Sequence, residues 1–387
     1  MSRPPAIALP LLLVGWLLLV PLAWLLGLLV LAGDLLASPL VWLSRRRLAV
    51  APARVPRRDV SVVVVSWNGR DHLERMLPSL EAALAAHGGD HEVVLVDNGS
   101  TDGTSEWVHA NFPRVRVVAL PENRFFVRGM EAGIAAATRD TLVLLNNDMV
   151  VDRGFLGPLL DGFTADDVFA VTADVVMQDP AARRVETGFT AAWFSLGHVK
   201  LQHRLPGAAD GAYPVVAWAG GGSTAYDRAK FLALGGFDRT FDPFYLEDAG
   251  ISYQAWRHGY RVLFCPASRV VHAHRGTSRR LFGDDFVDNT IRRNQHLFVW
   301  RNVTSPLLTA LHFATLPLVV LHRGFTSTGR TAAAGLLFEL RAVARALPRL
   351  PMAFCRRTVS RRTQCVADAE VVRRAGARAL QAPLAGA

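Results

Sequence analysis

Cysteine and lysine are both scarce in this chain of 387 residues. The cysteines are Cys265, Cys355 and Cys365. Three thiols so far apart exclude a disulfide framework and a cysteine-ligated metal cluster, and they suit a reducing compartment. Lysine occurs only at Lys200 and Lys230, so nearly all of the positive charge is arginine.

Signatures of nucleic-acid recognition are also missing. The formal net charge of +10 would suit nucleic acid, anionic lipid or phosphorylated substrates. Arginine-rich codon usage explains the same balance without any partner. No DNA- or RNA-binding motif accompanies the charge, and no aromatic stripe alternates with the arginines. We therefore expect no nucleic-acid partner.

Charge is absent altogether from residues 7–32, which are almost entirely apolar. A helix of this length, rising about 1.5 Å per residue, is long enough to cross a bilayer core of about 30 Å. A cleaved signal peptide is the alternative, but the run is too long and no A-x-A cleavage pattern closes it. We therefore predict an N-terminal transmembrane anchor over residues 1–43.

Arginines cluster directly after this apolar run, in a basic linker over residues 44–59, whereas only Arg3 precedes it. They are Arg45, Arg46, Arg47, Arg54, Arg57 and Arg58. The positive-inside bias places such a cluster on the cytoplasmic side of a membrane. We therefore expect a protein of the inner (plasma) membrane, with its main domain in the cytoplasm.

Apolar, β-branched runs then alternate with helical patterns. Strands are expected at residues 60–65, 92–96, 115–120 and 141–145, helices at 73–84 and 127–138, and shorter strands at 262–264 and 269–271. Strands alternating with helices favour a doubly wound α/β sheet. In such a sheet, ligands bind at the carboxyl ends of the strands.

Polar side chains follow two of these strands. Asp148 comes shortly after the strand at 141–145, with Asn146 two residues before it. Carboxylate and amide oxygens at this edge are suitable ligands for a divalent metal ion, and an Asx turn is the alternative. Asp97 ends the strand at 92–96. It is suited to accept hydrogen bonds from a nucleobase or ribose, or to form a turn of the same kind.

Glu247 and Asp248 open a helical stretch. A carboxylate there is suited to act as a general base, and the alternative is a solvated pair that complements the helix dipole. His272 and His274 follow the last short strand. A neutral imidazole at that point completes a metal site or has a purely structural role.

Taken in order, these segments resemble the motifs of family 2 glycosyltransferases with the GT-A fold, in the N-x-D form common among rhamnosyltransferase-like members. The matching segments are residues 60–68 (VSVVVVSWN), 96–103 (VDNGSTDG), 144–148 (LLNND), 235–238 (GGFD), 244–248 (FYLED), and Pro266 followed by His272. The resemblance runs over about residues 60–300 and implies a GT-A type doubly wound mixed sheet.

By this resemblance, the chain moves a sugar from a nucleotide-diphosphate donor to an acceptor hydroxyl, with inversion. The acceptor would be a glycan or a lipid-linked molecule in cell-surface or lipid-linked glycan synthesis. Asp248 would be the catalytic base, with Glu247 beside it.

The resemblance also implies three sets of binding residues. The nucleotide sugar would contact Ser66, Asn68, Asp97, Asn98, Ser100, Asn123, Asn146 and Asn147. The metal ion, Mg²⁺ or Mn²⁺, would be held by Asp148, His272 and Asn146. The acceptor would contact Gly221, Gly222 and Glu247.

Two segments depart from the family pattern. The stretch N-x-G-F-A-G-G-N-N reads NRFFVRGME over residues 123–131, so bulk and charge replace glycines that let the backbone approach the donor. The pattern E-D-x-D-L-x-x-R has Gly250 and Gln254 where the family has an acid and a base. Four residues apart on a helix, that acid and base would form an ion pair.

Two other functions remain as alternatives. One is a non-catalytic descendant that binds a sugar nucleotide or a glycan. The other is a nucleotidyltransferase, although residues 66–69 (SWNG) are not the glycine- and arginine-rich loop typical of that class.

The expected catalytic domain covers residues 60–282, with a nucleotide-sugar half at 60–150 and an acceptor half at 151–282. Residues 283–387 are expected to be helical and membrane-associated. Within them, the apolar run 306–321 is expected to be interfacial or re-entrant. Residues 336–347 favour an amphipathic helix on an anionic membrane, and a helix packed on the domain fits nearly as well.

Overall fold

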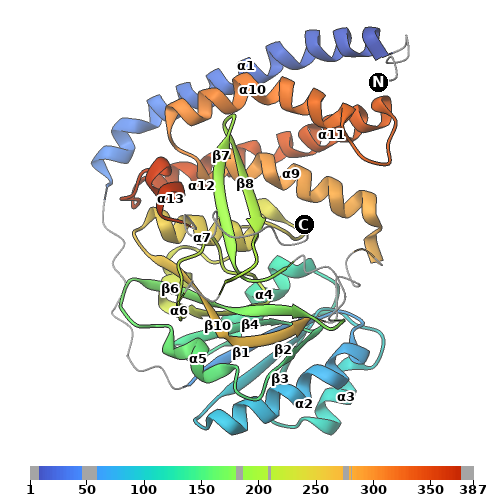
Figure 1. Ribbon diagram of the computed structural model, residues 1–387, viewed down its shortest axis with the longest axis vertical. Coiled ribbons are helices and arrows are strands. Elements are labelled where there is room, and N and C mark those ends of the chain that lie inside the picture. The colour runs from blue at the N-terminus through green and yellow to red at the C-terminus, as the bar shows by residue number, and fades with distance from the viewer. Residues whose placement is uncertain are drawn as a thin grey trace. The chain divides into compact units, whose positions relative to one another are not determined.

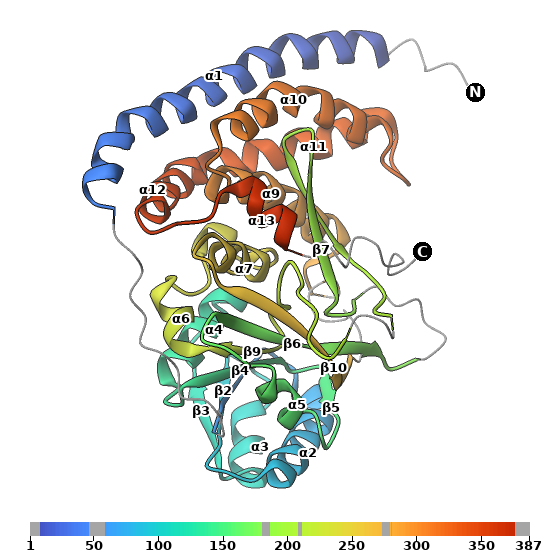
Figure 2. The same ribbon diagram turned by 60° about the vertical axis from the view of Figure 1, so that its left-hand side comes forward.

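The computed structural model describes residues 8–45, 59–179, 186–207, 211–272, 279 and 281–375. The chain divides into two compact units (Figures 1 and 2). The sheet unit comprises Leu48–Trp193, Leu201–Arg275 and Cys365–Ala387. The helical unit comprises Met1–Arg47, Phe194–Lys200 and Gly276–Gln364. Residue 274, and with it the alternative metal ligand His274, lies outside the described residues.

An eight-stranded sheet forms the centre of the sheet unit, in the order β3-β2-β1-β4-β9-β6-β10-β5 (Figure 1). The strands are β1 (Ser61–Ser66), β2 (Glu92–Asp97), β3 (Val115–Ala119), β4 (Thr141–Asn146), β5 (Met149–Val151), β6 (Val168–Met177), β9 (Ser223–Asp227) and β10 (Arg261–His272). Strands β1 to β4 are parallel, whereas β9 is antiparallel to both of its neighbours. The predicted mixed α/β sheet is therefore confirmed.

Helices pack against this sheet. They are α2 (Arg70–His87), α3 (Thr104–Asn111), α4 (Phe125–Ala136), α5 (Leu156–Asp161), α6 (Arg228–Ala233) and α7 (Glu247–Arg257). The short helix α13 (Asp368–Arg374) packs against α7, and a 3₁₀ turn η2 (Arg239–Phe241) packs against α4. Helix α2 buries Leu73, Leu77 and Leu80, three or four residues apart, in the same core as the β1 side chains Val62 and Val64. One apolar stripe on a helix against a strand of buried valines is the packing that the sequence pattern predicts.

The strand β10 differs from the prediction. Two short strands were expected at 262–264 and 269–271, but Arg261–His272 is continuous. Its register against β6 shifts between Cys265 and Arg269. Pro266 lies in this interval, and because proline has no N–H to donate to a ladder, it favours such an irregularity within a strand.

The helical unit is built from α1 (Ala8–Leu43), α9 (Asp284–Asn302), α10 (Pro306–Phe325), α11 (Ala332–Ala346), η3 (Leu347–Arg349) and α12 (Leu350–Arg361). Helix α10 packs against α1 and α11, and α9 packs against α11 and α12 (Figures 1 and 2). The tip of the hairpin formed by β7 (Thr190–Ser195) and β8 (His198–His203) also belongs to this unit.

Among the described residues, two helical segments are long and apolar enough to cross a membrane, Leu19–Leu43 and Pro306–Phe325. The first lies in the predicted anchor. The second extends four residues beyond the apolar run 306–321 and reaches 20 residues in length. By length and composition alone, helix α10 is long enough to span a membrane, whereas an interfacial or re-entrant segment was expected.

An ion pair joins α1 to α12 within the helical unit. Asp34 lies just beyond the uncharged stretch of α1 and is 6% exposed. The guanidinium of Arg357, which is fully buried, donates from Nε to Asp34 Oδ1 over 3.1 Å and from Nη2 to Thr309 Oγ1 over 3.1 Å. Arg361 Nη1 donates to the same carboxylate over 3.0 Å. The acid of α1 is therefore fully paired, as buried charges need to be.

Helix α11 packs on its own unit. Its residues Leu336 and Val343 are buried, and its Glu339 is buried beside Arg292 of α9, with 2.9 Å between Nε and Oε1. These contacts favour the second of the two interpretations of residues 336–347, a helix packed on the domain. Membrane association of the helices after residue 283 remains a prediction.

Candidate functional site

The predicted nucleotide-binding residues meet at the carboxyl edge of the sheet. Ser66 of β1 pairs in register with Asp97 of β2, and the neighbouring Val65 pairs with Asn146 of β4. Three parallel strands thus end together, each with a polar residue at its last position. This is the sheet edge at which ligands of open α/β sheets bind.

Asp97 shapes the loop after β2. Its Oδ1 accepts from the backbone N–H of Ser100 over 2.9 Å, and its Oδ2 accepts from the hydroxyl of Ser105. The Ser100 hydroxyl in turn accepts from the backbone N–H of Asn68 over 2.9 Å. The turn proposed as the alternative role of Asp97 is therefore present, and its nucleoside contact remains a prediction.

Asn98 and Asn123 order the loop before α4. The amide of Asn98 donates to Asn123 Oδ1 over 3.0 Å, and its own oxygen accepts from the N–H of Arg124 over 2.9 Å. Asn123 Oδ1 also accepts from the N–H of Phe125 over 2.8 Å. Phe125 has a φ of +62° where the family pattern has glycine. The left-handed backbone is thus kept despite the bulkier residue, a conformation that costs about 1–3 kcal/mol.

The charges that replace glycine and asparagine in the stretch 123–131 have partners. Arg128 Nε lies 3.0 Å from Asp242 Oδ2, and Glu131 Oε2 lies 2.7 Å from Arg239 Nη2. Both pairs link α4 to the segment around η2, which leads into the Glu247–Asp248 motif. The departure therefore substitutes ion pairs for backbone flexibility in this part of the site.

Ser66 and Asn147 touch across β1 and β4. Asn147 Nδ2 donates to Ser66 Oγ over 2.9 Å, and both residues are buried. A Cβ added at Gly69 would lie 2.3 Å from Asn147 Nδ2, so a side chain there would displace the Asn147 amide. A Cβ added at Gly222 would similarly lie 2.3 Å from the side chain of Asn146. Asn146, predicted to bind the nucleotide sugar, and Gly222, predicted to bind the acceptor substrate, are thus neighbours.

Asp148 and His272 form a buried pair. Asp148 Oδ2 lies 3.1 Å from His272 Nε2, and Glu186 Oε2 lies 3.0 Å from Nδ1 of the same ring. Burial alone would lower the pKa of His272, but its hydrogen bonds to the two carboxylates outweigh burial and raise that pKa to about 10. Burial would raise the pKa of Asp148, yet the His272 contact holds it below its ordinary value.

This pair suits a divalent metal ion. Two ligands bound side by side to an octahedral ion about 2.1 Å away are about 3 Å apart, close to the 3.1 Å between Asp148 Oδ2 and His272 Nε2. A metal ion there would take the place of the imidazole proton. Glu186 would then accept from the other ring nitrogen, as carboxylates commonly do for metal-bound histidines.

Glu247 and Asp248 start α7 directly after an unusual turn. Tyr245 and Leu246 have φ values of +71° and +70°, a left-handed conformation rare for such residues. The carboxylate of Asp248 accepts from the N–H of Gly221 over 3.2 Å and from the N–H of Ala249 over 2.7 Å. The predicted base therefore lies against the predicted acceptor loop.

The two adjacent carboxyl groups have different environments. Burial raises the pKa of Asp248 to about 6, and the charge of Glu186 adds to this, while the N–H groups of Ala249 and Gly221 oppose it. Burial and the charge of Asp248 raise the pKa of Glu247 further above its ordinary range. Glu247 Oε2 has no hydrogen-bond partner among the described residues. Asp248 is therefore the carboxyl group of the two that ionises near neutral pH.

Sequence reasoning missed Glu186. It connects the predicted metal pair to the predicted base, because it bonds His272 and acts electrostatically on Asp248. It lies between β6 and β7, without the strand-end signal that marked the other acids. The nearest signal is Gly188, whose φ is +74° and whose added Cβ would lie 2.2 Å from the carbonyl oxygen of Ala173.

The support of α7 was also missed. Arg257 and Tyr253 of α7 both bond the buried carboxylate of Asp368 in α13, the hydroxyl of Tyr253 over 2.7 Å. A side chain at Gly250 would collide with Phe241, since an added Cβ would lie 2.7 Å from its ring. The ion pair absent from Gly250 and Gln254 is thus replaced by close ring packing and a pair elsewhere on the helix.

Two family models match the chain. The family described as Glycosyl transferase family 2 matches residues 61–218, and Glycosyl transferase family group 2 matches residues 141–354, more than half of the chain. The chain therefore belongs to the family 2 glycosyltransferases. The resemblance found in the sequence is confirmed.

Individual relatives match the same region. N-acetylgalactosaminyltransferase 6 of Drosophila melanogaster is 27% identical over 242 residues, which are 58% of this chain and 35% of that protein. The N-acetylglucosaminyl-diphospho-decaprenol L-rhamnosyltransferase of Mycobacterium tuberculosis is 24% identical over 237 residues, 54% of this chain and 75% of that protein. The chain thus spans about a third of the length of the first of these relatives.

Solved structures share the fold. Staphylococcus aureus TarS 1-349 in complex with UDP-GlcNAc aligns with a TM-score of 0.52 at 13% identity, covering 79% of this chain and 89% of that one. GalNAc-T7 with UDP, GalNAc and Mn²⁺ aligns with a TM-score of 0.50 at 20% identity, covering 66% and 50%. These likenesses confirm the GT-A type of sheet.

Proposed function

We propose that this protein transfers a sugar from a nucleotide-diphosphate donor to an acceptor hydroxyl, with inversion at the anomeric carbon. One observation carries the proposal. Asp248 at the sheet edge is a half-buried carboxyl group with a pKa raised to about 6, which accepts from the N–H of Gly221 and lies in the field of Glu186, the acid that bonds His272 of the Asp148–His272 pair. A base and a candidate diphosphate-binding centre thus occupy one site.

Asp248 performs the proton transfer in this proposal. In most molecules the Asp248 carboxyl group is ionised at neutral pH. Its pKa of about 6 makes it a stronger base than an ordinary aspartate. The N–H groups of Gly221 and Ala249 hold the carboxylate in place. Burial and the charge of Asp248 raise the pKa of Glu247, which favours the protonated form that would donate a hydrogen bond to the acceptor.

Asp148 and His272, with Asn146 nearby, would hold the divalent ion, Mg²⁺ or Mn²⁺. Such an ion, when bound, neutralises charge on the departing diphosphate. Glu186 keeps the His272 ring oriented. The loops at Asn68, Asp97 and Asn98 would bind the nucleoside and the sugar. A glycan or lipid-linked acceptor is consistent with the likeness to the mycobacterial N-acetylglucosaminyl-diphospho-decaprenol L-rhamnosyltransferase.

The test is a panel of nucleotide sugars presented to the purified full-length chain, with and without Mg²⁺ or Mn²⁺. We expect metal-dependent release of nucleoside diphosphate from one donor or a small group of donors. Donor binding without any turnover would instead indicate a non-catalytic descendant. Release of pyrophosphate from a nucleoside triphosphate and a sugar phosphate would indicate a nucleotidyltransferase.

We further propose that α1 crosses the inner (plasma) membrane and leaves the catalytic domain in the cytoplasm. The uncharged run and the arginines after it support this orientation. A reporter fused after residue 60 should be active only if it works in the cytoplasm. Secretion of a shortened mature chain would contradict the proposal.

A further inference from the structure

Three histidines lie together inside the helical unit. They are His198 at the hairpin tip, His296 of α9 and His312 of α10, and they are 4%, 1% and 0% exposed. One ring nitrogen from each lies within 4.8 Å of the others. The ring of His312 is 4.3 Å from that of His198 and 6.3 Å from that of His296, centre to centre. Three segments, of which the hairpin tip is distant in sequence from the two helices, thus bring three imidazoles together.

Several nitrogens of this cluster lack hydrogen-bond partners among the described residues. They are His198 Nε2 and both ring nitrogens of His296. A neutral imidazole always has one N–H donor and one lone pair. Leaving such groups buried without partners is destabilising. A ligand that accepts lone pairs would offset part of this cost, and apolar packing alone would not.

The surroundings favour neutral imidazoles. Burial lowers the pKa of His198 and of His296, and the nearby charge of Arg323 lowers both further. Lys200 adds to the effect at His198, and Arg292 adds to it at His296. Neutral imidazole is the form that ligates metal ions.

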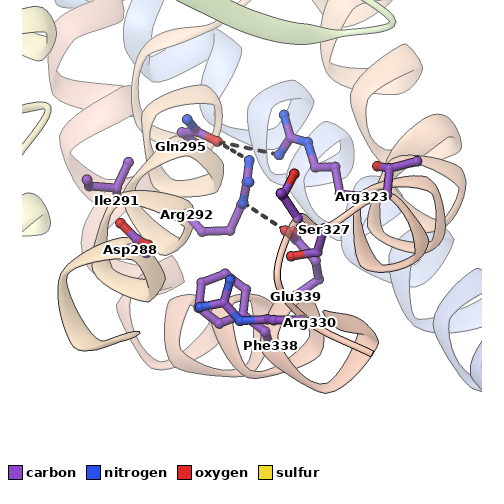
Figure 3. A pocket seen from close by; sticks show the side chains of 11 residues that line it. Asp288, Ile291, Arg292, Gln295, Arg323, Ser327, Arg330, Phe338 and Glu339 are labelled. Atoms are coloured by element: carbon purple, nitrogen blue, oxygen red, sulfur yellow. Dashed lines mark hydrogen bonds and ion pairs between the residues drawn. The ribbon is translucent and has the colours of Figure 1, made fainter. Parts of the chain in front are cut away.

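The neighbouring positive charges are partly compensated. Arg292 pairs with Glu339, and both Arg292 and Arg323 donate to Gln295 Oε1, over 2.9 and 3.4 Å (Figure 3). These residues line a pocket of about 370 Å³ within the helical unit. The remaining positive charge opposes the binding of a cation at the histidine cluster. It favours an anion at any coordination position that the histidines leave open.

We propose that His198, His296 and His312 bind a divalent transition-metal ion of the zinc type. Three imidazoles around one ion match its preference for nitrogen ligands, whereas Mg²⁺ prefers oxygen. With metal–nitrogen distances of about 2.0–2.1 Å, the three nitrogens, which lie within 4.8 Å of one another, must approach to about 3.3 Å when the ion binds. The ion would tie the hairpin tip to α9 and α10.

A hydrogen bond from Trp300 indicates which nitrogen of His312 would bind the metal ion. Its Nε2 accepts from the indole N–H of Trp300 over 3.1 Å, so Nε2 carries the lone pair of the neutral ring. That lone pair is the one that a metal ion would take. The metal ion and the indole therefore compete for the same atom.

The experiment measures metal binding by the full-length protein in detergent, independently of any activity. Chelator-treated protein is titrated with Zn²⁺ against a competing indicator and with Co²⁺ by visible ligand-field absorption. We expect one equivalent to bind beyond any ion held by Asp148 and His272, with an affinity that falls at least about 100-fold in His296→Gln and in His312→Gln. His322→Gln is the matched control, because His322 is an exposed histidine of the same helix α10.

Two further variants separate this site from the catalytic one and from simple misfolding. The double variant Asp148→Asn with His272→Gln should keep the zinc affinity, since both residues belong to the sheet unit. Trp300→Phe removes the competing donor and should tighten binding several-fold. Wild-type protein that binds no more Zn²⁺ than His296→Gln would overturn the proposal. Loss of binding in the double variant would also overturn it, and weaker binding in Trp300→Phe would contradict Nε2 as the ligand.

Discussion

Asp248→Asn should lower turnover by about 10²–10⁴-fold, the usual contribution of general-base catalysis. Asparagine keeps the shape of the side chain but cannot take the proton of the acceptor hydroxyl. Its oxygen still accepts one of the two backbone N–H bonds that Gly221 and Ala249 donate to the carboxylate. Donor affinity, measured by titration with the nucleotide sugar, should therefore stay nearly unchanged.

Glu247→Gln is the matched control, one residue away on the same helix. Because successive helical residues point about 100° apart, only one of the two carboxyl groups faces the acceptor as a base. The glutamine variant should impair acceptor affinity at least as much as turnover. If Glu247→Gln has no turnover and Asp248→Asn has normal turnover, Glu247 is the base instead of Asp248. Full turnover in both variants would refute the mechanism.

The pH profile provides the same test without mutation. The pKa of Asp248 is raised to about 6, so its carboxylate is lost as the pH falls through that value. Wild-type turnover should therefore decline on the acid side with a midpoint near pH 6. A flat profile down to pH 4.5 would exclude Asp248 as the base.

Asp148→Asn should reduce turnover at least about 10²-fold, because it removes the charged oxygen that suits a divalent ion beside His272. Asp152→Asn is the matched control, since Asp152 is exposed and lies only four residues further along the chain. Wild-type turnover should disappear in excess chelator and return with Mg²⁺ or Mn²⁺. Full activity in chelator would refute the metal assignment.

Mn²⁺ binding is a second measurement, and a purely structural role of Asp148 would not affect it. Mn²⁺ binding, followed by its electron paramagnetic resonance, should weaken in Asp148→Asn and remain in Asp152→Asn. The melting temperature of both variants shows whether the fold is retained. Weak Mn²⁺ binding with an intact fold would assign Asp148 to the metal ion, and unchanged binding would assign it to the orientation of His272.

The parallel half of the sheet could be read from the sequence. Residues 60–65, 92–96 and 141–145 are mostly apolar runs, and the strands β1, β2 and β4 match them within one residue at each end. Strands buried on both faces need such runs, so the local signal and the final structure agree. The polar residues that end them were placed at the ligand edge for the same reason.

The other half of the sheet depends on contacts that no local pattern shows. Strand β9 enters between β4 and β6 in the opposite direction, and β10 continues through Pro266. Glu186 reaches His272 across 86 positions of sequence, without a motif around it. The roles of the site residues remain predictions, although the structure brings Asp148, His272 and Asp248 into one connected network.

The histidine cluster was equally invisible in the sequence. His312 interrupts an apolar run, which marks it as unusual, but His198 and His296 lie in ordinary mixed segments. Only the folded helical unit shows that their rings face one another. Metal sites assembled from distant segments lack the short spacings by which sequence patterns are recognised.

The pairing of Asp34 with Arg357 gives α1 a role in the stability of the helical unit. A chain shortened to begin after residue 43 would lose the only carboxylate seen to pair with Arg357 among the described residues. Leaving one partner of a buried pair alone costs about 3–5 kcal/mol, a large part of the 5–15 kcal/mol that holds an average domain together. The N-terminal helix is thus a structural member of the helical unit rather than a removable tether, and soluble forms of this enzyme would need a new partner for that arginine.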